Sequence, residues 1–371
     1  MSERIEDEYR DLASHLDKMP VGYPSTESGI ELKILKHLFS PEEAKIAMNL
    51  GFTPLELKKI HRKMKAEGIS LQELESKLDK MYQKGLINYG KDMKGEKEIK
   101  YYANAPLVIG MFEYQLNRLS KEFLKDMEQY FQEAFMEEYN KPGIPQLRTI
   151  PIEESIPHEQ NIATYDMMRD LINTVGTPIG VAECICKKGK DILGDPCKKT
   201  DMREVCFTFR TAAESYHEKG LARLISKEEA LKILTKAEKD GLVLQPANSI
   251  RPMCICCCCG CCCEVLLNQK KGAQPAKFFA TNFYAEIDDE LCVGCGLCED
   301  RCNMDAISII EEKSVIDLDK CIGCGVCIPS CVNDAISLQK KEEELVPPKN
   351  TIATYMKIME NKAKLARALK N

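Results

Sequence analysis

The sequence predicts an α+β protein with a helical first part that lacks cysteine and a second part organised around thiols. Three observations predict this. Helix-initiating Ser/Thr-x-x-Glu patterns recur in the first third of the chain. All 20 cysteines lie between Cys184 and Cys331, and the last eight repeat one spacing pattern. The segments we expect are a helical domain (1–140), a proline-rich linker with a helix (141–175), a cysteine-rich metal domain (176–285), a repeated cysteine domain (286–341) and a C-terminal docking helix (342–371).

The composition is that of a folded protein, with 44% hydrophobic and 30% charged residues and a net charge of −6. No run of about 18 apolar residues is present, and the acidic N-terminus lacks the apolar region of a secretory signal. We therefore expect a cytoplasmic protein without a membrane partner. Clustered thiols in the cytosol bind metal or carry out redox chemistry, and so many of them suit an anaerobic organism.

The helical domain is predicted from its helix starts. Three segments have Ser or Thr followed by Glu at the third position, with Pro in the first turn of two of them: Ser40–Glu43, Thr53–Glu56 and Ser70–Glu73. Two short β-type pieces follow, at Leu86–Tyr89 and Ile99–Ala103, and a polar loop over Gly90–Glu98 is expected to join them.

This order of elements over residues 28–104 resembles a winged helix-turn-helix domain. The resemblance implies that Leu71–Lys84 is the recognition helix. That helix contains no Arg, and its acidic residues nearly cancel its lysines, whereas DNA binding depends on positive charge and on Arg, Lys, Asn and Gln. We therefore expect a structural or partner-docking domain, and nucleic acid remains a possible but disfavoured partner.

The segment between the helical domain and the cysteines changes character twice. Met111–Tyr139 has apolar residues at spacings of three and four, which predicts one long amphipathic helix. Four prolines then make 141–160 an expected linker. A helix over Tyr165–Val175 and a buried strand over Ile179–Ala182 lead into the first cysteines.

The strongest motif is a repeat of four cysteines near the C-terminus. Its first copy is Cys292-x2-Cys295-x2-Cys298-x3-Cys302, and its second copy is Cys321-x2-Cys324-x2-Cys327-x3-Cys331. Each copy has two glycines at equivalent places and is followed by Asp-Ala-Ile-Ser. Glycine lets the backbone approach a bound group closely.

This repeat resembles the bacterial two-cluster ferredoxin module over about 286–339. The resemblance implies two 4Fe-4S clusters, in which three ligands come from one copy and the fourth from the other. One cluster would be held by Cys292, Cys295, Cys298 and Cys331, and the other by Cys321, Cys324, Cys327 and Cys302. The chain departs from the family at Asn303 and Val332, where proline is usual after the fourth cysteine. Zinc or free thiols are the alternative to clusters.

A second constellation consists of Cys184, Cys186, Cys197 and Cys206, which follow the predicted strand. It looks like cysteine-rich stretches of multi-cluster iron–sulfur proteins from anaerobic microbes. A third cluster, a structural zinc and unligated thiols are all open readings. Lys187, Lys188 and Lys190 would offset the negative charge of a cluster.

The third constellation has eight thiols between Cys254 and Cys263. Neighbouring side chains diverge, so we expect ligands three residues apart, such as Cys256, Cys259 and Cys262. The Cys258-Cys259-Gly260 triplet resembles the CCG modules of heterodisulfide reductases, although those modules need further cysteines and usually occur in pairs. A fourth cluster, a cluster shared with Cys184–Cys206, another soft metal and redox-active thiols all remain open.

No dinucleotide loop, Walker loop or catalytic triad can be assigned, so no catalytic residue is predicted and an enzyme activity stays undecided. We expect a multi-cluster electron-transfer protein that serves an anaerobic oxidoreductase, with two 4Fe-4S clusters and one or two more in 184–263. Two alternatives are an iron–sulfur-sensing winged-helix regulator and a thiol or disulfide reductase that uses the cysteine-dense stretch.

Overall fold

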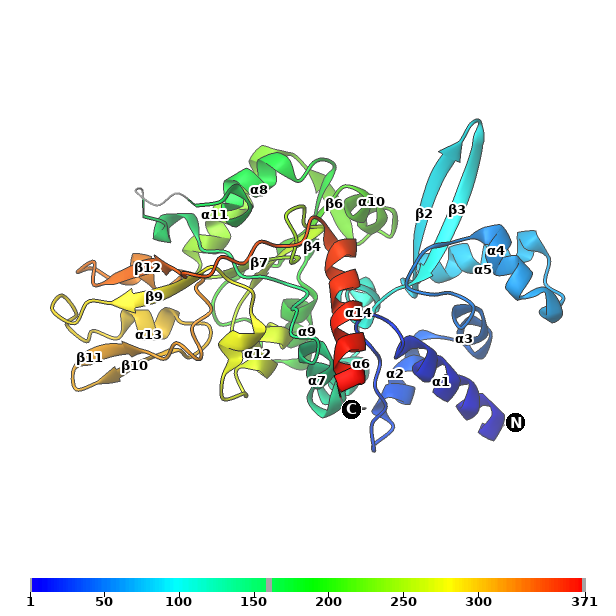
Figure 1. Ribbon diagram of the computed structural model, residues 1–371, viewed down its shortest axis with the longest axis horizontal. Coiled ribbons are helices and arrows are strands. Elements are labelled where there is room, and N and C mark those ends of the chain that lie inside the picture. Colours follow the sequence, from blue (N-terminus) through cyan, green and yellow to red (C-terminus); the bar gives the residue numbers. More distant parts are fainter. Residues whose placement is uncertain (1, 158–161, 369–371) are drawn as a thin grey trace. The chain divides into compact units, whose positions relative to one another are not determined.

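The computed structural model describes residues 2–157 and 162–368 and contains two compact units (Figure 1). Unit 1 is Met1–Lys141 with Lys362–Asn371, and unit 2 is Pro142–Asn361. Helix and strand are mixed in both units, which confirms the predicted α+β class. Across the described residues, no helix combines the length and the apolar character that crossing a bilayer requires.

Unit 1 begins with a series of short helices. At α3 the predicted start is confirmed, because Ser40 Oγ accepts from the Glu43 N–H at 3.3 Å and the Glu43 carboxylate accepts from the Ser40 N–H at 2.9 Å. Ser70 caps α5 in the same way, at 3.2 Å from the Glu73 nitrogen. The helices are α1 (Ser2–Leu16), α2 (Ile30–Leu38), α3 (Pro41–Ala47), α4 (Leu57–Lys63) and α5 (Leu71–Gln83).

The start predicted at Thr53 is wrong. Leu55 and Glu56 form a two-residue strand, β1 (Leu55–Glu56), that pairs with Tyr102 and Tyr101, and α4 begins only at Leu57. Glu56 makes no side-chain cap. A long-range strand pairing therefore overrides the local signal for a helix at this point.

A β-hairpin completes the sheet of unit 1. Strands β2 (Ile87–Lys94) and β3 (Lys97–Asn104) pair along their whole length, and the sheet order is β1-β3-β2. The polar loop expected over Gly90–Glu98 is therefore wrong. The turn consists of Gly95 and Glu96 alone, and the φ of 66° at Gly95 suits a tight hairpin.

The long helix predicted over Met111–Tyr139 is wrong in its first part. The helical run begins at Lys121, because Ser120 caps it by accepting from the Phe123 N–H at 3.1 Å. It continues through α6 (Lys121–Tyr130), a π-type turn η4 (Phe131–Phe135) and α7 (Met136–Asn140). The apolar spacing upstream of Ser120 belongs to short turns, η2 (Leu107–Met111) and η3 (Glu113–Gln115).

The proline-rich segment at the start of unit 2 packs into the core and is not a free linker. Ile150 and Ile152 are fully buried, and Ile150 bridges to Leu244. Arg148 is buried as well, and its guanidinium pairs with the Asp166 carboxylate at 2.6 Å. The helix predicted next is confirmed as η6 (Thr164–Asp166) and α8 (Met168–Thr174).

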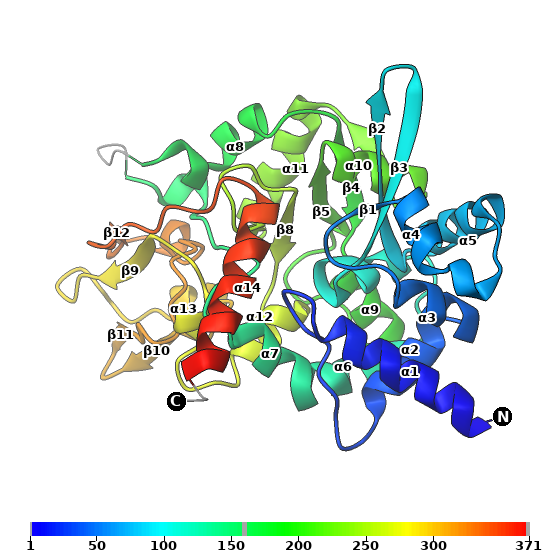
Figure 2. The same cartoon turned by 45° about the vertical axis from the view of Figure 1, so that its right-hand side comes forward.

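Unit 2 is built on a five-stranded antiparallel sheet of order β6-β4-β5-β8-β7, here called the thiol-rich sheet. One face is apolar and is covered by α8 and α11, which lie beside the strands in Figure 2. Gly180 and Thr208 face α10 on the other side. The strands are β4 (Ile179–Glu183), β5 (Glu204–Phe209), β6 (Ala222–Ile225), β7 (Val243–Pro246) and β8 (Cys254–Cys258).

The helices of this region connect the strands. The capping box at Ser226 is confirmed, with its hydroxyl 3.2 Å from the Glu229 nitrogen at the start of α11. The helices are α9 (Ile185–Leu193), α10 (Thr211–Glu218), α11 (Lys227–Lys239) and α12 (Glu264–Gln269).

The last cysteines lie in a C-terminal module, defined here as residues 283–340. It has two antiparallel pairs, β9 with β12 and β10 with β11. Each pair brings one copy of the sequence repeat together with the other. The elements are β9 (Phe283–Ile287), α13 (Leu297–Arg301), β10 (Ile307–Ile310), β11 (Lys313–Ile316), η8 (Ile328–Ser330) and β12 (Ile336–Lys340).

The predicted C-terminal helix is confirmed as α14 (Thr351–Ala368). Its first part packs in unit 2, where Ile358 is fully buried and the Tyr355 hydroxyl donates to Gln146 Oε1 at 2.9 Å. Its later part belongs to unit 1, where Lys362 pairs with Glu138. The helix that we expected to dock a partner thus docks within its own chain.

Candidate metal centres

The two copies of the cysteine repeat have the same backbone conformation. Asp305 and Asp334 both have a φ of 52°, and the next residue in each copy donates its N–H to a cysteine sulfur. These bonds run from Ala306 to Cys302 at 3.3 Å and from Ala335 to Cys331 at 3.2 Å. Backbone donors directed at sulfur stabilise a thiolate that binds a metal cluster.

The glycines of the repeat are required by close packing. Gly294 and Gly323 both have a φ of 64°, and a Cβ atom on either would collide with a carbonyl, of Glu312 and Phe283 respectively. Only glycine accommodates both restrictions. The cysteine loops are therefore held close to neighbouring backbone, as the sequence comparison of the two copies implied.

A cavity is lined by the four cysteines that the resemblance groups together first, Cys292, Cys295, Cys298 and Cys331. The Ser314 N–H lies 3.4 Å from Cys292 Sγ, and the N–H groups of Ser314 and Gly294 lower the pKa of Cys292. The residues thus fit an anionic group: four sulfurs surround one space, and backbone dipoles favour negative charge there.

The second expected set lies next to the first. Cys302, Cys321 and Cys324 interact electrostatically with Cys327, which is also close enough to Cys298 to feel its charge. Burial raises the pKa of Cys324 to about 12. A site of this kind would hold thiolates only with a positive group to compensate them, as iron in a cluster does.

The cysteines of β8 alternate between the two faces of the thiol-rich sheet. Cys254, Cys256 and Cys258 share one face, and Cys256 pairs directly with Cys206 of β5. Ile255 and Cys257 point into the apolar core on the other face. The period of a strand therefore separates the thiols of this run.

Three more thiols extend the row on that face. Cys184 caps the start of α9, Cys186 lies in its first turn, and Cys263 caps the start of α12. Each member interacts with the next by sulfur–sulfur contact. We call the following set the thiol row: Cys184, Cys186, Cys206, Cys254, Cys256, Cys258 and Cys263.

Two members of the row are disposed to ionise. Hydrogen bonds from Cys206, Cys254 and Cys258 lower the pKa of Cys256. Hydrogen bonds from the Cys186 and Cys258 thiols lower the pKa of Cys263 to about 6. The row thus contains thiolates, the form of cysteine that binds metal and attacks disulfides.

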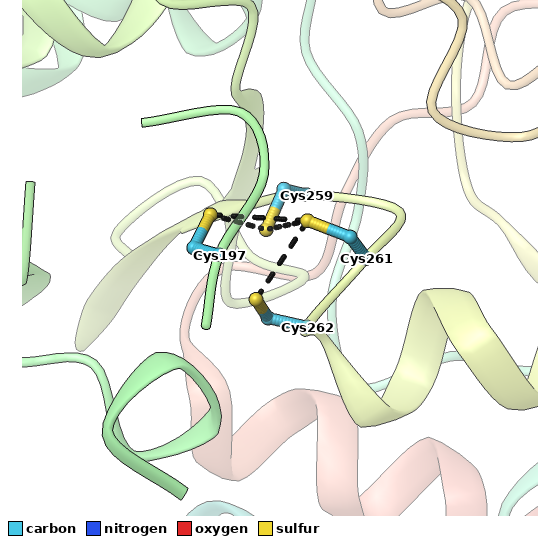
Figure 3. A group of neighbouring side chains, drawn as sticks. All are labelled: Cys197, Cys259, Cys261 and Cys262. Atoms are coloured by element: carbon cyan, nitrogen blue, oxygen red, sulfur yellow. Dashed lines mark hydrogen bonds between the residues drawn. The ribbon is translucent and has the colours of Figure 1, made fainter. Parts of the chain in front are cut away.

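The remaining thiols of the region form a compact cluster, the four-sulfur group of Cys197, Cys259, Cys261 and Cys262 (Figure 3). Cys197 Sγ lies 3.6 Å from that of Cys259 and 3.8 Å from that of Cys261. Hydrogen bonds from Cys259 and Cys262 lower the pKa of Cys197. All four sulfurs lie within 4.8 Å of one another.

The groupings expected from the sequence are therefore wrong in part. Cys197 lies with the 259–262 turn and not with Cys184, Cys186 and Cys206. Cys256 and Cys259, expected as common ligands, belong to different groups, because β8 ends at Cys258 and the chain turns there.

Sequence reasoning also missed four members of the two groups: Cys254, Cys258, Cys261 and Cys263. The alternation of cysteines at 254, 256 and 258 was the signal that could have placed two of them on one face of a strand.

Lys187 lies between the two groups. It is 1% exposed, and its ammonium donates to the Cys257 carbonyl at 3.0 Å. Burial lowers its pKa, but the thiolates of Cys184, Cys259, Cys258 and Cys197 raise it more strongly, so the net shift is upward. The other two expected counter-charges are paired elsewhere, Lys188 with Glu183 and Lys190 with Glu264.

Asn303 joins the C-terminal module to the thiol-rich region. It is 2% exposed, accepts from the Gly260 N–H at 2.9 Å and donates to the Gly241 carbonyl at 2.8 Å. Gly260 has no room for a Cβ because the Asn303 backbone packs against it. The departure from proline at this position thus has a structural reason, whereas Val332, its counterpart, is exposed.

The comparisons with known proteins agree with this geometry. Residues 284–332 match the family of 4Fe-4S dicluster domains. No curated protein and no solved structure matches the chain. The C-terminal module is therefore a ferredoxin-like iron–sulfur domain, and it supports an iron–sulfur electron-transfer role for the protein.

Proposed function

We propose that the protein is a multi-cluster electron carrier that passes electrons between a redox partner protein and its thiol-rich region. The observation that carries this is the packing of the C-terminal module against that region within unit 2. The Cys324 carbonyl accepts from the Ile152 N–H at 3.1 Å, and Val326 is buried in the core of the thiol-rich sheet. A relay needs its stations close together, and this packing supports it.

The eight cysteines of the module would hold two 4Fe-4S clusters. Cys292, Cys295, Cys298 and Cys331 line one cavity, which supports the first set. The mutual interactions of Cys302, Cys321, Cys324 and Cys327 support the second. Clusters bound there supply reversible uptake of single electrons. Cys295 is exposed, which suits the first site for exchange with a partner.

The thiol row would hold a third cluster. It offers seven sulfurs, two of which have a lowered pKa, and the buried Lys187 ammonium lies beside it. A buried cation offsets the negative charge of thiolates and raises the potential of a bound cluster.

Unit 1 would dock the partner oxidoreductase. Residues 28–104 have the helices and antiparallel hairpin of a winged helix-turn-helix domain, but the lysines around α5 are neutralised. Lys77 pairs with Glu42 at 2.6 Å, and Lys100 pairs with Glu75 and Asp79 at 2.9 Å. This disfavours the DNA-binding regulator, which a gel shift with the oxidised and the reduced protein would detect.

A thiol or disulfide reductase is the second candidate, and the lowered pKa of Cys256 and Cys263 favours it. Turnover of a disulfide with a low-potential donor, lost in Cys256→Ser while the signals of the C-terminal module persist, would support a reductase over a carrier.

The proposed function is tested with the full chain purified without oxygen. Iron and acid-labile sulfide analysis should give about 12 of each per chain from clusters, four for each of the three. A spectroelectrochemical titration followed by EPR should show one-electron steps. A colourless sample without sulfide would overturn the proposal, and about 8 irons would remove the cluster from the thiol row.

A further inference from the structure

The four-sulfur group is more compact than a cluster site. In addition to the contacts of Cys197, Cys259 Sγ lies 3.5 Å from Cys261 Sγ, which lies 3.7 Å from Cys262 Sγ (Figure 3). Four thiolates bound at about 2.3 Å to one ion, at the corners of a tetrahedron, lie about 3.8 Å apart. The observed separations match the edges of such a tetrahedron.

The C-terminal module provides an internal comparison. Each ligand of a cube binds a different iron atom, so its sulfurs must lie farther apart than those around a single ion. Among the described residues, no three of the module's cysteines bring their sulfurs within 4.8 Å of one another, whereas all four sulfurs of the four-sulfur group do so. The two kinds of site therefore differ in size within one molecule.

The chain builds this group from a loop and a turn. Cys197 follows α9, whose end is marked by Gly194 with a φ of 89°. The other three sulfurs belong to the turn between β8 and α12, where the Cys263 N–H donates to the Cys259 carbonyl at 3.1 Å. This turn makes the adjacent Cys261 and Cys262 side chains converge, which an extended strand would not do.

The surroundings favour negative charge on these sulfurs. The N–H groups of Lys199 and Thr200 point at Cys197 Sγ, and Arg203 lies near Cys197 and Cys262. The buried Lys187 ammonium lies near Cys197 and Cys259. A divalent ion with four thiolates carries a net charge of −2, and these groups are placed to balance it.

We propose that Cys197, Cys259, Cys261 and Cys262 bind a single divalent thiophilic ion, zinc or ferrous iron, in a tetrahedral site separate from every cluster. Soft thiolate ligands in a tetrahedron select these ions. The site would fix the loop after α9 to the β8–α12 turn, and Gly260 of that turn is bonded to Asn303 of the C-terminal module. The proposal does not depend on electron transfer.

The test is metal and sulfide analysis of the full-length protein, purified without oxygen, for Cys197→Ser and Cys261→Ser. Each should lose one zinc or one iron per chain and no acid-labile sulfide. Cys257→Ala is the matched control, because that thiol points into the apolar core, and it should keep every ion. Loss of about four irons with their sulfide, or no loss of metal, would overturn the proposal.

Spectroscopy of the unaltered protein keeps the test valid if the variants fail to fold. Zinc X-ray absorption should show four sulfur neighbours at about 2.3 Å and no second metal nearby. If the ion is iron, Mössbauer spectra should show one high-spin ferrous site apart from the clusters. The absence of both signals would overturn the proposal.

Discussion

The C-terminal module and the thiol-rich sheet both gather cysteines, but they do so by different physical means. In the module, sulfurs meet because loops of fixed spacing adopt one local conformation twice, with matching φ angles at Gly294 and Gly323. In the sheet, sulfurs meet because distant segments pair: Cys206 lies opposite Cys256 on neighbouring strands, and Cys197 reaches the turn at Cys259.

This difference decides how far each site can be inferred from the sequence. A ligand set encoded by loop spacing is legible without the fold, whereas one set by strand register depends on which strands pair. It also decides how the sites respond to change, because the sheet has more sulfurs than one cluster needs and the module has none to spare.

The largest expected effect is the loss of a whole cluster. The double variant Cys324→Ala/Cys327→Ala should lose about four irons and four sulfides, because no spare thiol of the module replaces two ligands. Cys256→Ala/Cys258→Ala, the matched change in the thiol row, should leave the EPR signals of the module unchanged. Iron, sulfide and EPR measurements check both. Loss of the module's signals in the second variant would show that the two regions do not form separate sites.

Asn303→Ala tests the junction between the two regions. The variant leaves the buried N–H of Gly260 and the carbonyl of Gly241 without partners, at a cost of about 1–3 kcal/mol each. The free energy of unfolding, measured by denaturant without oxygen, should fall accordingly. Val332→Ala, at the equivalent exposed position of the other copy, should change it by less than about 0.5 kcal/mol. Equal effects would contradict a junction at Asn303.

The features that the sequence predicted correctly are local ones. The hydroxyls of Ser40, Ser70 and Ser226 cap helices as expected, because a cap needs only residues three positions apart. The same holds for the repeat in the C-terminal module, whose match to the dicluster family begins at residue 284.

The failures arise where distant residues decide. Leu55 and Glu56 became a strand because Tyr102 and Tyr101 pair with them, and the polar hairpin after Tyr89 is held by its backbone ladder without an apolar pattern. The start of the long helix was misplaced because Ser120 lacks the usual Glu three residues later. The cysteine groups were mixed because strand β8 ends between Cys258 and Cys259.

A smaller effect concerns the pH dependence of stability next to the same junction. Glu238 on α11 is 6% exposed, and its carboxylate accepts from the Glu153 N–H at 3.1 Å. Burial raises the pKa of Glu238 to about 7, and the charges of Glu153 and Glu154 add to this shift. Between its unfolded pKa and about 7, the folded chain holds a proton that the unfolded chain has lost.

Stability should therefore be complete below the unfolded pKa of Glu238 and should decline as pH rises through about 7, by roughly 3 kcal/mol in all. Glu238→Gln should remove this decline, because the amide stays neutral at every pH. Glu228→Gln, an exposed change on the same helix, should leave it in place. Denaturant unfolding of the three proteins at pH 5 and pH 8 measures the difference. Parallel pH profiles for the unaltered protein and Glu238→Gln would show that this carboxyl is charged in the folded state, and that the junction is not sensitive to pH.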